Sequence, residues 1–507
     1  MSTVTVHCVN GHADRLRLAT KAQEAKLSAH VPWDHNPHAF TVSHQDSNAV
    51  SAFLRQLSKD PNYALIDSTT SAGKYRAHLR RHDAKAKAEA PADESKAKTK
   101  ATPATTYGRT AAYMAKYYNF PMPSFTKQRV CLAVISLGGG YQQSDLDTYF
   151  QTVLGYPKDQ CPTVITVAID GAKPKYTGSD VDVENALDLQ ILGGICPNSI
   201  ILFISAPNTD QGFYDAFNTA VAGATVNGVQ YKPSVVSCSW GAPESTFGSS
   251  VLRAYDQCFQ LGNAAGVTFT AAAGDSGSSD GDGATIPRCD FPASSPNVTA
   301  CGGTSLTGAI EVAWSWSKYY GWGTGGGISA MFKAPTYQQS VITYPTNTQP
   351  SLTSLKGNRG VPDISLNADP ISGWTIQFDG SPLVNEIGGT SCVAPAVAGL
   401  LGLMNLRYPT SFNASLYAVY GSANRITCFR DITSGTNDDL RHSVGVYSCG
   451  KGYDFVTGLG AVNGFNLYAQ LQTTLTKVNG SGKGIRRGGM HPIMRLMVLR
   501  ARRQRKA

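Results

Sequence analysis

Hydrophobic residues along the chain fall into short runs that alternate with longer stretches of helical periodicity. The runs are four to six residues long and lie at residues 130–135, 163–168, 199–204, 234–237 and 268–272. Runs of this length between turn residues are typical of buried strands. Their alternation with helices predicts an α/β fold built on a doubly wound parallel sheet.

One helix is predicted to be buried on nearly all sides, because residues 393–404 are apolar almost all round. A strand is predicted at 374–378, and a pair of glycines before Ser391 allows a tight turn between strand and helix. Ser391 lies at the helix start, where free N–H groups favour developing negative charge. It is the candidate nucleophile, although serine here is also typical of a simple helix cap.

A nucleophilic serine needs a base, and the chain between residues 107 and 476 contains a single histidine, His442. Glu184 and Asp188 offer an alternative, because their spacing places both carboxylates on one face of a predicted helix. A solvated pair is the commoner interpretation of such spacing. The apolar residues around this pair favour a buried acid pair instead.

Asp275 is the third acidic candidate. It lies in a Gly-Asp-Ser-Gly turn directly after the predicted strand 268–272. Loops at the carboxyl ends of strands build the sites of α/β sheets, so Asp275 could join Ser391 and Glu184. An aspartate in such a turn is otherwise typical of a local Asx turn.

Composition divides the chain into four parts. Residues 1–81 mix apolar and polar residues and predict a small α+β region. Residues 82–106 are rich in Ala, Lys, Glu and Pro and predict a flexible, cleavable linker. Residues 107–476 form the large unit, and residues 477–507 predict a basic, disordered tail.

The net charge of +9 comes from the tail, which holds ten Lys or Arg and no acidic residue, so the rest of the chain carries −1. We therefore expect no nucleic-acid binding by the main domain. No apolar run has the length of a transmembrane helix, and the start lacks the pattern of a signal peptide. The 11 cysteines are more than a reducing cytosol needs. A monomer is expected.

Several further motifs occur in order along the large unit, at residues 237–241, 291–299, 323–329 and 359–365. Together with the stretches around Glu184, Asp275 and Ser391, they resemble the sedolisin family of serine-carboxyl peptidases, from about residue 107 to 471. The resemblance implies a subtilisin-like fold and a peptidase made as a precursor. It also implies hydrolysis of peptide or protein substrates at acid pH, either internally or by removal of tripeptides.

The resemblance also implies roles for individual residues. Ser391, Glu184 and Asp188 would form the triad, and protonated Asp275 would complete the oxyanion hole. Residues 1–81 resemble a prodomain, so this N-terminal region is a candidate inhibitor of its own peptidase domain. Kumamolisins carry a glutamate in the first strand of the large domain, and the matching residue here is Ser136.

One calcium ion is implied as well. The matching ligand positions are Asp431, Ile432, Gly450, Gly452 and Asp454. Two carboxylates and three backbone carbonyls suit a hard cation that takes six to eight oxygens. Cys428 and Cys449 flank these segments, which leaves open a disulfide or two free buried thiols.

A different class of function remains open at this stage. The chain could be a catalytically silent protein that keeps the sedolisin fold and uses its basic tail to bind a partner. Because all four catalytic positions are present, the peptidase is the leading interpretation.

Overall fold

The structure is a computed structural model of the chain. It describes residues 109–123, 129–281, 287–307, 310–315, 322–344, 355–438 and 447–481, together with the backbone of six short strands before residue 82.

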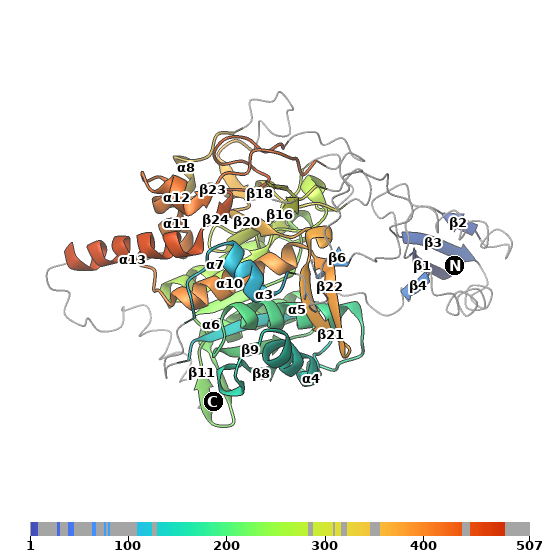
Figure 1. The fold of residues 1–507 in the computed structure, drawn as a ribbon. Helices are drawn as coiled ribbons and strands as arrows, with labels where there is room; N and C mark the ends of the chain where they lie inside the picture. Colours follow the sequence, from blue (N-terminus) through green and yellow to red (C-terminus); the bar gives the residue numbers. More distant parts are fainter. Residues whose placement is uncertain are drawn as a thin grey trace, which may run out of the picture.

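The centre of the molecule is an eight-stranded sheet in the order β17-β16-β14-β12-β7-β9-β8, with β20 paired to β16 (Figure 1). All neighbours are parallel except β17, which lies antiparallel to β16. The strands are β7 (Cys131–Ser136), β8 (Thr163–Ala168), β9 (Ile200–Ser205), β12 (Val235–Cys238), β14 (Thr268–Ala272), β16 (Thr299–Thr307), β17 (Ile310–Ala313) and β20 (Ile364–Asn367). The parallel sheet and all five predicted strands are confirmed.

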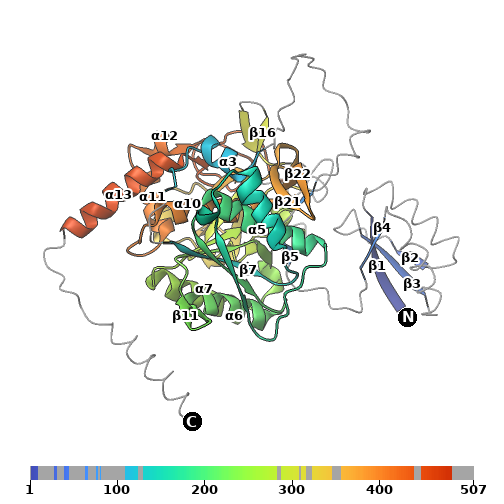
Figure 2. The same cartoon turned by 60° about the horizontal axis from the view of Figure 1, so that its bottom comes forward.

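Helices cover both faces of this sheet (Figure 2). Along β7, Leu132 and Val134 belong to a hydrophobic cluster that includes α5 (Asp180–Ile195) and α10 (Val393–Met404). The alternate residues Ala133 and Ile135 belong to a second cluster, with α6 (Asp210–Ala222) and α7 (Ser249–Ala264). Because successive side chains of a strand point to opposite faces, the sheet lies between two helical layers.

The predicted central helix is α10, and nearly all of its residues are buried. It packs tightly against α5, since a Cβ added to Gly399 would lie 2.8 Å from the Cβ of Ile195. A glycine at this crossing lets the two helix backbones approach closely. The packing fixes α5 relative to the chain that leads into α10.

The remaining elements lie around this core. The helices are α3 (Ala111–Tyr117), α4 (Gln143–Asp147), α8 (Thr336–Gln339), α11 (Phe412–Tyr420), α12 (Arg425–Cys428) and α13 (Gly464–Ser481). The strands are β10 (Ala224–Val226), β11 (Val229–Tyr231), β13 (Trp240–Pro243), β15 (Asp290–Phe291), β18 (Gly327–Lys333), β19 (Asn358–Val361), β21 (Trp374–Phe378), β22 (Ser381–Gly388), β23 (Phe429–Arg430) and β24 (Ala461–Val462).

The N-terminal part contributes an antiparallel sheet of its own, in the order β2-β3-β1-β4. Its strands are β1 (Ser2–Cys8), β2 (Ser28–His30), β3 (Ala39–His44) and β4 (Tyr63–Ile66). Two further strands, β5 (Arg76–Ala77) and β6 (Arg80–Arg81), pair with the main domain instead. The predicted linker 82–106 lies outside the described residues. Helix α13 continues to Ser481, into the predicted tail 477–507, and residues 482–507 lie outside the described residues.

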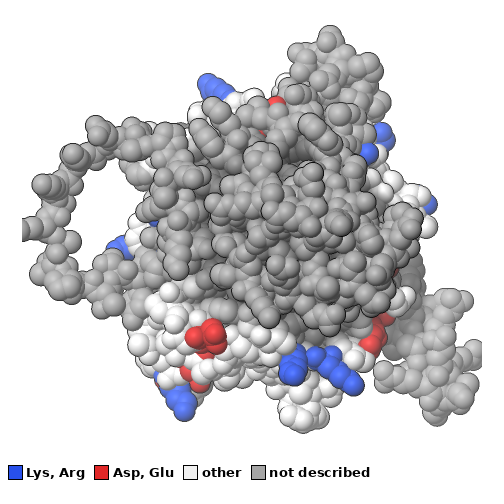
Figure 3. Space-filling model, turned by 90° about the vertical axis from the view of Figure 1, so that its right-hand side faces the viewer, with Lys and Arg blue, Asp and Glu red and all other residues white. Residues whose placement is uncertain are grey.

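The surface and the cysteines bear on the expected compartment and partners. On the described part of the face shown in Figure 3, Lys and Arg side chains are scattered and form no continuous patch. No helix in the described ranges is both long and apolar enough to cross a membrane.

Ten cysteines between residues 131 and 449 are free thiols, including Cys428 and Cys449, so the structure contains no disulfide between these two.

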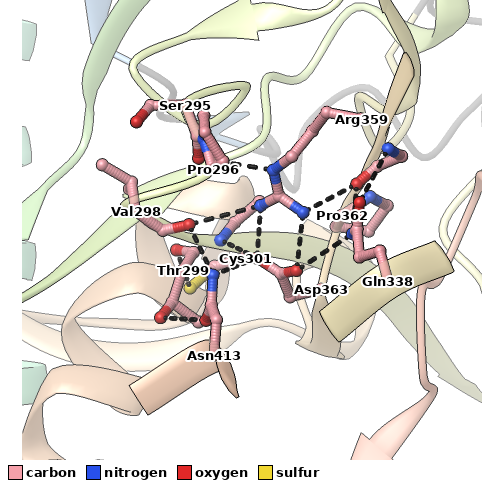
Figure 4. A network of polar contacts seen from close by, with 12 residues as sticks. Ser295, Pro296, Val298, Thr299, Cys301, Gln338, Arg359, Pro362, Asp363 and Asn413 are labelled. Atoms are coloured by element: carbon pink, nitrogen blue, oxygen red, sulfur yellow. Dashed lines mark hydrogen bonds and ion pairs between the residues drawn. The ribbon is translucent and has the colours of Figure 1, made fainter. Parts of the chain in front are cut away.

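A buried ion pair joins β20 to the neighbouring elements (Figure 4). Arg359 and Asp363 are both 0% exposed and form two parallel bonds of 2.8 and 2.6 Å. The Asp363 carboxylate also accepts hydrogen bonds from Tyr417, Asn413 and the backbone N–H of Ala300. Every oxygen of this carboxylate is therefore paired, which offsets much of the cost of burying a charge.

Replacing Asp363 by Asn should destabilise the domain by about 3–5 kcal/mol, because the Arg359 charge would stay buried without its partner. Denaturant unfolding followed by fluorescence measures this change. The exposed Arg253→Ala variant is the control and should change the free energy of unfolding by less than about 0.5 kcal/mol. A similar small change in both variants would contradict the importance of the pair.

Candidate active site

Ser391 lies in a single 3-10 turn, η7 (Thr390–Cys392), between strand β22 and helix α10. Gly389 has φ of 97°, a left-handed conformation that favours glycine and makes the sharp turn. The Ser391 side chain is 0% exposed, and its hydroxyl makes no hydrogen bond to any described residue. The turn thus presents an unengaged hydroxyl at the start of a buried helix.

Glu184 and Asp188 lie one turn apart on α5, and both are 0% exposed. The prediction of a buried acid pair is confirmed, and the solvated pair is excluded. Burial raises the pKa of Glu184 well above its ordinary value, and the nearby charges of Asp188 and Asp275 raise it further. The Ser391 hydroxyl acts in the opposite direction. These four groups therefore lie close enough to influence one another.

Burial also raises the pKa of Asp188, and a hydrogen bond from Ser239 lowers it. The Ser239 Oγ lies 2.6 Å from Asp188 Oδ1 and 3.4 Å from the backbone oxygen of Ser391. Ser239 follows β12 and thus links the acid pair to the nucleophile turn. Sequence reasoning gave this serine no role, although it lies in the motif at residues 237–241.

Asp275 follows β14, as predicted, and is 0% exposed. Its Oδ1 accepts hydrogen bonds from the backbone N–H and the hydroxyl of Thr390, both at 2.8 Å. Asp275 is thus held by the residue directly before Ser391. A local Asx turn does not describe this arrangement, because the partner lies 115 residues away in the sequence.

The acid network does not extend beyond Asp188 among the described residues. Ser136, where kumamolisins carry a glutamate, directs its Oγ toward Gly138 O and Asn185 Oδ1, each 2.8 Å away. Asp188 Oδ2 and the indole N–H of Trp240 are buried and have no hydrogen-bond partner among the described residues. The Ser136 hydroxyl therefore bonds to Gly138 and Asn185, and neither of these bonds goes to Asp188.

Two strand edges flank the nucleophile. Strand β13 begins at Trp240, next to Ser239, and β22 ends at Gly388, shortly before Ser391. The N-terminal strand β5 pairs antiparallel with β13, and β6 pairs antiparallel with β22. Strands β6 and β22 lie side by side in Figure 1. Residues 76–77 and 80–81 of the N-terminal part therefore pair with the strand next to Ser239 and with the strand that leads to Ser391.

The residues expected to hold calcium come together at a separate place, between β23 and β24. The backbone N–H of Gly452 donates to Asp431 Oδ2 at 2.9 Å, and that of Gly450 donates to Asp454 Oδ2 at 3.1 Å. Burial raises the pKa of Asp454 to about 6, although backbone N–H groups partly oppose this. Within the described ranges, no three or more His, Cys, Asp or Glu side chains form a cluster suited to a metal.

The adjacent Ile432 is buried, at 1% exposure. A ligand at Ile432, Gly450 or Gly452 would act through its backbone carbonyl, so a search for side-chain clusters does not test these three positions. The two carboxylates and the glycine loop nevertheless converge.

Comparisons with known proteins agree with this geometry. A model of the subtilase family matches residues 174–441. Kumamolisin from Bacillus sp. (strain MN-32) is 39% identical over 388 residues, which cover 75% of this chain and 66% of kumamolisin. Sedolisin from Pseudomonas sp. (strain 101) is 27% identical over 371 residues, 69% of this chain and 59% of sedolisin. The matches thus span less than two thirds of these relatives.

A solved structure is also similar. Pseudomonas sedolisin, a serine-carboxyl proteinase complexed with two molecules of pseudo-iodotyrostatin, superposes with a TM-score of 0.58 at 26% identity, over 73% of this chain and 99% of that structure. The fold is therefore that of the subtilisin-like peptidases. Within that class, the chain belongs to the sedolisin family of serine-carboxyl peptidases.

Proposed function

We propose that the chain is a serine peptidase that hydrolyses peptide bonds at acid pH through Ser391, Glu184, Asp188 and Asp275. The observation that carries this proposal is the convergence of three buried carboxyl groups on one buried serine hydroxyl. Burial and mutual repulsion disfavour three ionised carboxylates together. A site of this kind works with protons shared among its acids, which suits acid pH.

The proposed reaction begins when Glu184 accepts the hydroxyl proton of Ser391 and Oγ attacks the substrate carbonyl carbon. Asp188 shares a proton with Glu184 and orients it, while Ser239 donates to Asp188. Protonated Asp275 donates a hydrogen bond to the oxygen of the tetrahedral intermediate. Glu184 then protonates the leaving amine, and water repeats the sequence on the acyl-enzyme.

These roles predict a pH dependence. Burial raises the pKa of both Glu184 and Asp188, so the pair keeps a proton to higher pH than free carboxylic acids, which ionise near pH 4. The Asp275 donor works only in its protonated form. We therefore expect kcat/KM to reach its maximum below neutral pH and to fall as the pH rises.

Hydrolysis of an acid-denatured protein, followed from pH 2 to pH 9, tests this expectation. Ser391→Ala should lower the rate by about 10⁴-fold or more, because the nucleophile acts as a unit with its base. Ser365→Ala is the control, since this serine is also buried with no hydrogen-bond partner for its hydroxyl among the described residues. Peak activity at pH 8, or unchanged activity in Ser391→Ala, would reject the proposed roles.

We further infer that the N-terminal region blocks the substrate cleft of the precursor. The support is the antiparallel pairing of β5 with β13 and of β6 with β22, which uses both strand edges beside Ser391. Edge strands bind extended peptides through backbone hydrogen bonds, so the same edges would serve a substrate. A substrate and the segment 76–81 therefore compete for one site.

Proline at Ala77 or Arg80 should open the cleft, because proline removes a backbone N–H from the strand. In the Ser391→Ala background, which prevents self-cleavage, we expect both variants to bind a fluorescent peptide substrate at least about tenfold more tightly. A proline at Lys85, within the predicted linker, is the matched control. Equal affinity in all three proteins would contradict the blocking role.

We also propose that one calcium ion binds at Asp431, Ile432, Gly450, Gly452 and Asp454. Two carboxylates converge on one glycine loop, and oxygen donors of this kind suit a hard cation. The raised pKa of Asp454 supports a cation here, because a buried carboxylate gains most from a positive partner. The ion would stabilise the loop between β23 and β24, far from the chemical steps.

Calcium should raise the thermal stability, and more at pH 7 than at pH 4. Without metal, the pKa of Asp454 is about 6 instead of 3.8, so stability falls as the pH rises between these values. Calcium binds the ionised form, so its contribution grows over the same window and reaches about 2.7 kcal/mol at a hundredfold excess over Kd. Thermal unfolding with calcium and with EDTA measures this difference.

Asp454→Asn should abolish the effect of calcium, whereas the exposed Asp379→Asn should keep it. If EDTA leaves the thermal stability of the wild type unchanged, the proposed site is wrong. The same holds if EDTA lowers the stability of the wild type and of Asp454→Asn equally.

A further inference from the structure

Thr390, the residue before the nucleophile, holds the Asp275 side chain by two hydrogen bonds. Its backbone N–H and its Oγ1 each lie 2.8 Å from the same oxygen, Asp275 Oδ1. Both residues are 0% exposed. Hydrogen bonds to a carboxyl group in a buried site are stronger than those in water, so this contact fixes the orientation of the carboxyl group.

The Thr390 hydroxyl has a second neighbour, Gly274. The N–H of Gly274 donates to Oγ1 at 3.1 Å, and the oxygen of Gly274 lies 3.2 Å away. A hydroxyl has one hydrogen to donate. Asp275 Oδ1 is the nearer acceptor, at 2.8 Å against 3.2 Å for the Gly274 oxygen, so the hydroxyl accepts from Gly274 and donates to Asp275.

Two donors on Oδ1 determine where the proton of a neutral Asp275 resides. The protonated oxygen of a carboxylic acid is a donor and a poor acceptor, whereas its carbonyl oxygen accepts. Oδ1 therefore acts as the carbonyl oxygen, and the proton resides on Oδ2.

We propose that Thr390 is a positioning residue that reserves Oδ2 of Asp275 as the donor to the oxyanion. This role rests on the function proposed above. With this role, two neighbouring residues serve two parts of the reaction. Ser391 supplies the nucleophile, and Thr390 orients the Asp275 acid that stabilises the resulting negative charge.

The backbone around Asp275 is held independently of this side-chain contact. The Asp275 oxygen accepts from the N–H of Gly323 at 3.0 Å, and the Gly274 oxygen accepts from the N–H of Gly325 at 2.7 Å. Loss of the Thr390 hydroxyl would therefore leave the loop in place. It would leave the Thr390 backbone N–H as the remaining Thr390 donor to Oδ1, which weakens the preference that keeps the proton on Oδ2.

Thr390→Val keeps the shape and the backbone N–H but removes the hydroxyl. We expect kcat to fall by about tenfold or more, because donors to the oxyanion act mainly on the transition state, with KM changed by less than about twofold. Thr390→Ser restores the hydroxyl and should recover kcat to within about threefold of wild type. Thr375→Val is the matched control, since Thr375 is a buried threonine whose hydroxyl has no partner among the described residues.

A pair of inhibitors separates this role from a merely structural one. With a peptide aldehyde, Ser391 Oγ bonds to the carbonyl carbon, its proton passes to Glu184, and the carbonyl oxygen becomes the oxyanion. The matching peptide alcohol cannot form this adduct. In Thr390→Val, the aldehyde should lose affinity by the factor lost from kcat/KM, whereas the affinity of the alcohol should not change.

Wild-type kcat in Thr390→Val, or equal losses of affinity for aldehyde and alcohol, would overturn the role of Thr390. If Thr390→Val does not fold, as judged by its unfolding midpoint, Thr390→Ala takes its place in a cycle with Asp275→Asn. The double variant should then be no slower than Asp275→Asn alone, and additive losses would reject the proposal. Activity retained in Ser391→Ala would instead mean that the proposed function itself is wrong.

Discussion

The close packing of α5 against α10 is the constraint on which the site depends. Helix α5 carries Glu184 and Asp188, and α10 is entered through the turn that carries Ser391, so the distance between these helices sets the distance between the acid pair and Ser391. Gly399 allows this approach, because a Cβ there would lie 2.8 Å from the Cβ of Ile195. The same packing removes water from Glu184 and Asp188, and this desolvation raises the pKa of both. Each unit of such a shift corresponds to about 1.4 kcal/mol between the two protonation states.

Buried carboxyl groups in this domain differ in whether their oxygens have hydrogen-bond partners. Asp363 is paired with Arg359 and accepts further hydrogen bonds, so its charge is satisfied by the fold. Glu184 makes no close, well-aligned hydrogen bond to a described residue through either carboxylate oxygen, although the nearby Ser391 and Ser239 hydroxyls lower its pKa, and Asp188 makes none through Oδ2. Polar groups buried without partners are costly, and natural proteins keep them where they serve a function. In this respect Asp363 differs from Glu184 and Asp188.

The strand edges near Ser391 determine the direction in which an extended chain can bind beside it. Both β13 and β22 pair antiparallel with successive parts of the N-terminal segment. An extended chain held on both edges passes the nucleophile in one orientation, and a substrate on these edges would have the same orientation.

Local patterns in the sequence determined much of this protein. Short apolar runs in the sequence determined five strands of the central sheet, which are β7, β8, β9, β12 and β14. A longer apolar segment determined α10, because a helix that is buried on every side has no polar face. The spacing of Glu184 and Asp188 determined that they share a helix face. Only the tertiary structure decided the contacts of Ser239 and Thr390, whose partners lie 51 and 115 residues away. Such contacts arise when strands and helices from distant parts of the chain meet at one edge of the sheet, and no local pattern specifies which hydroxyl will then face which carboxylate.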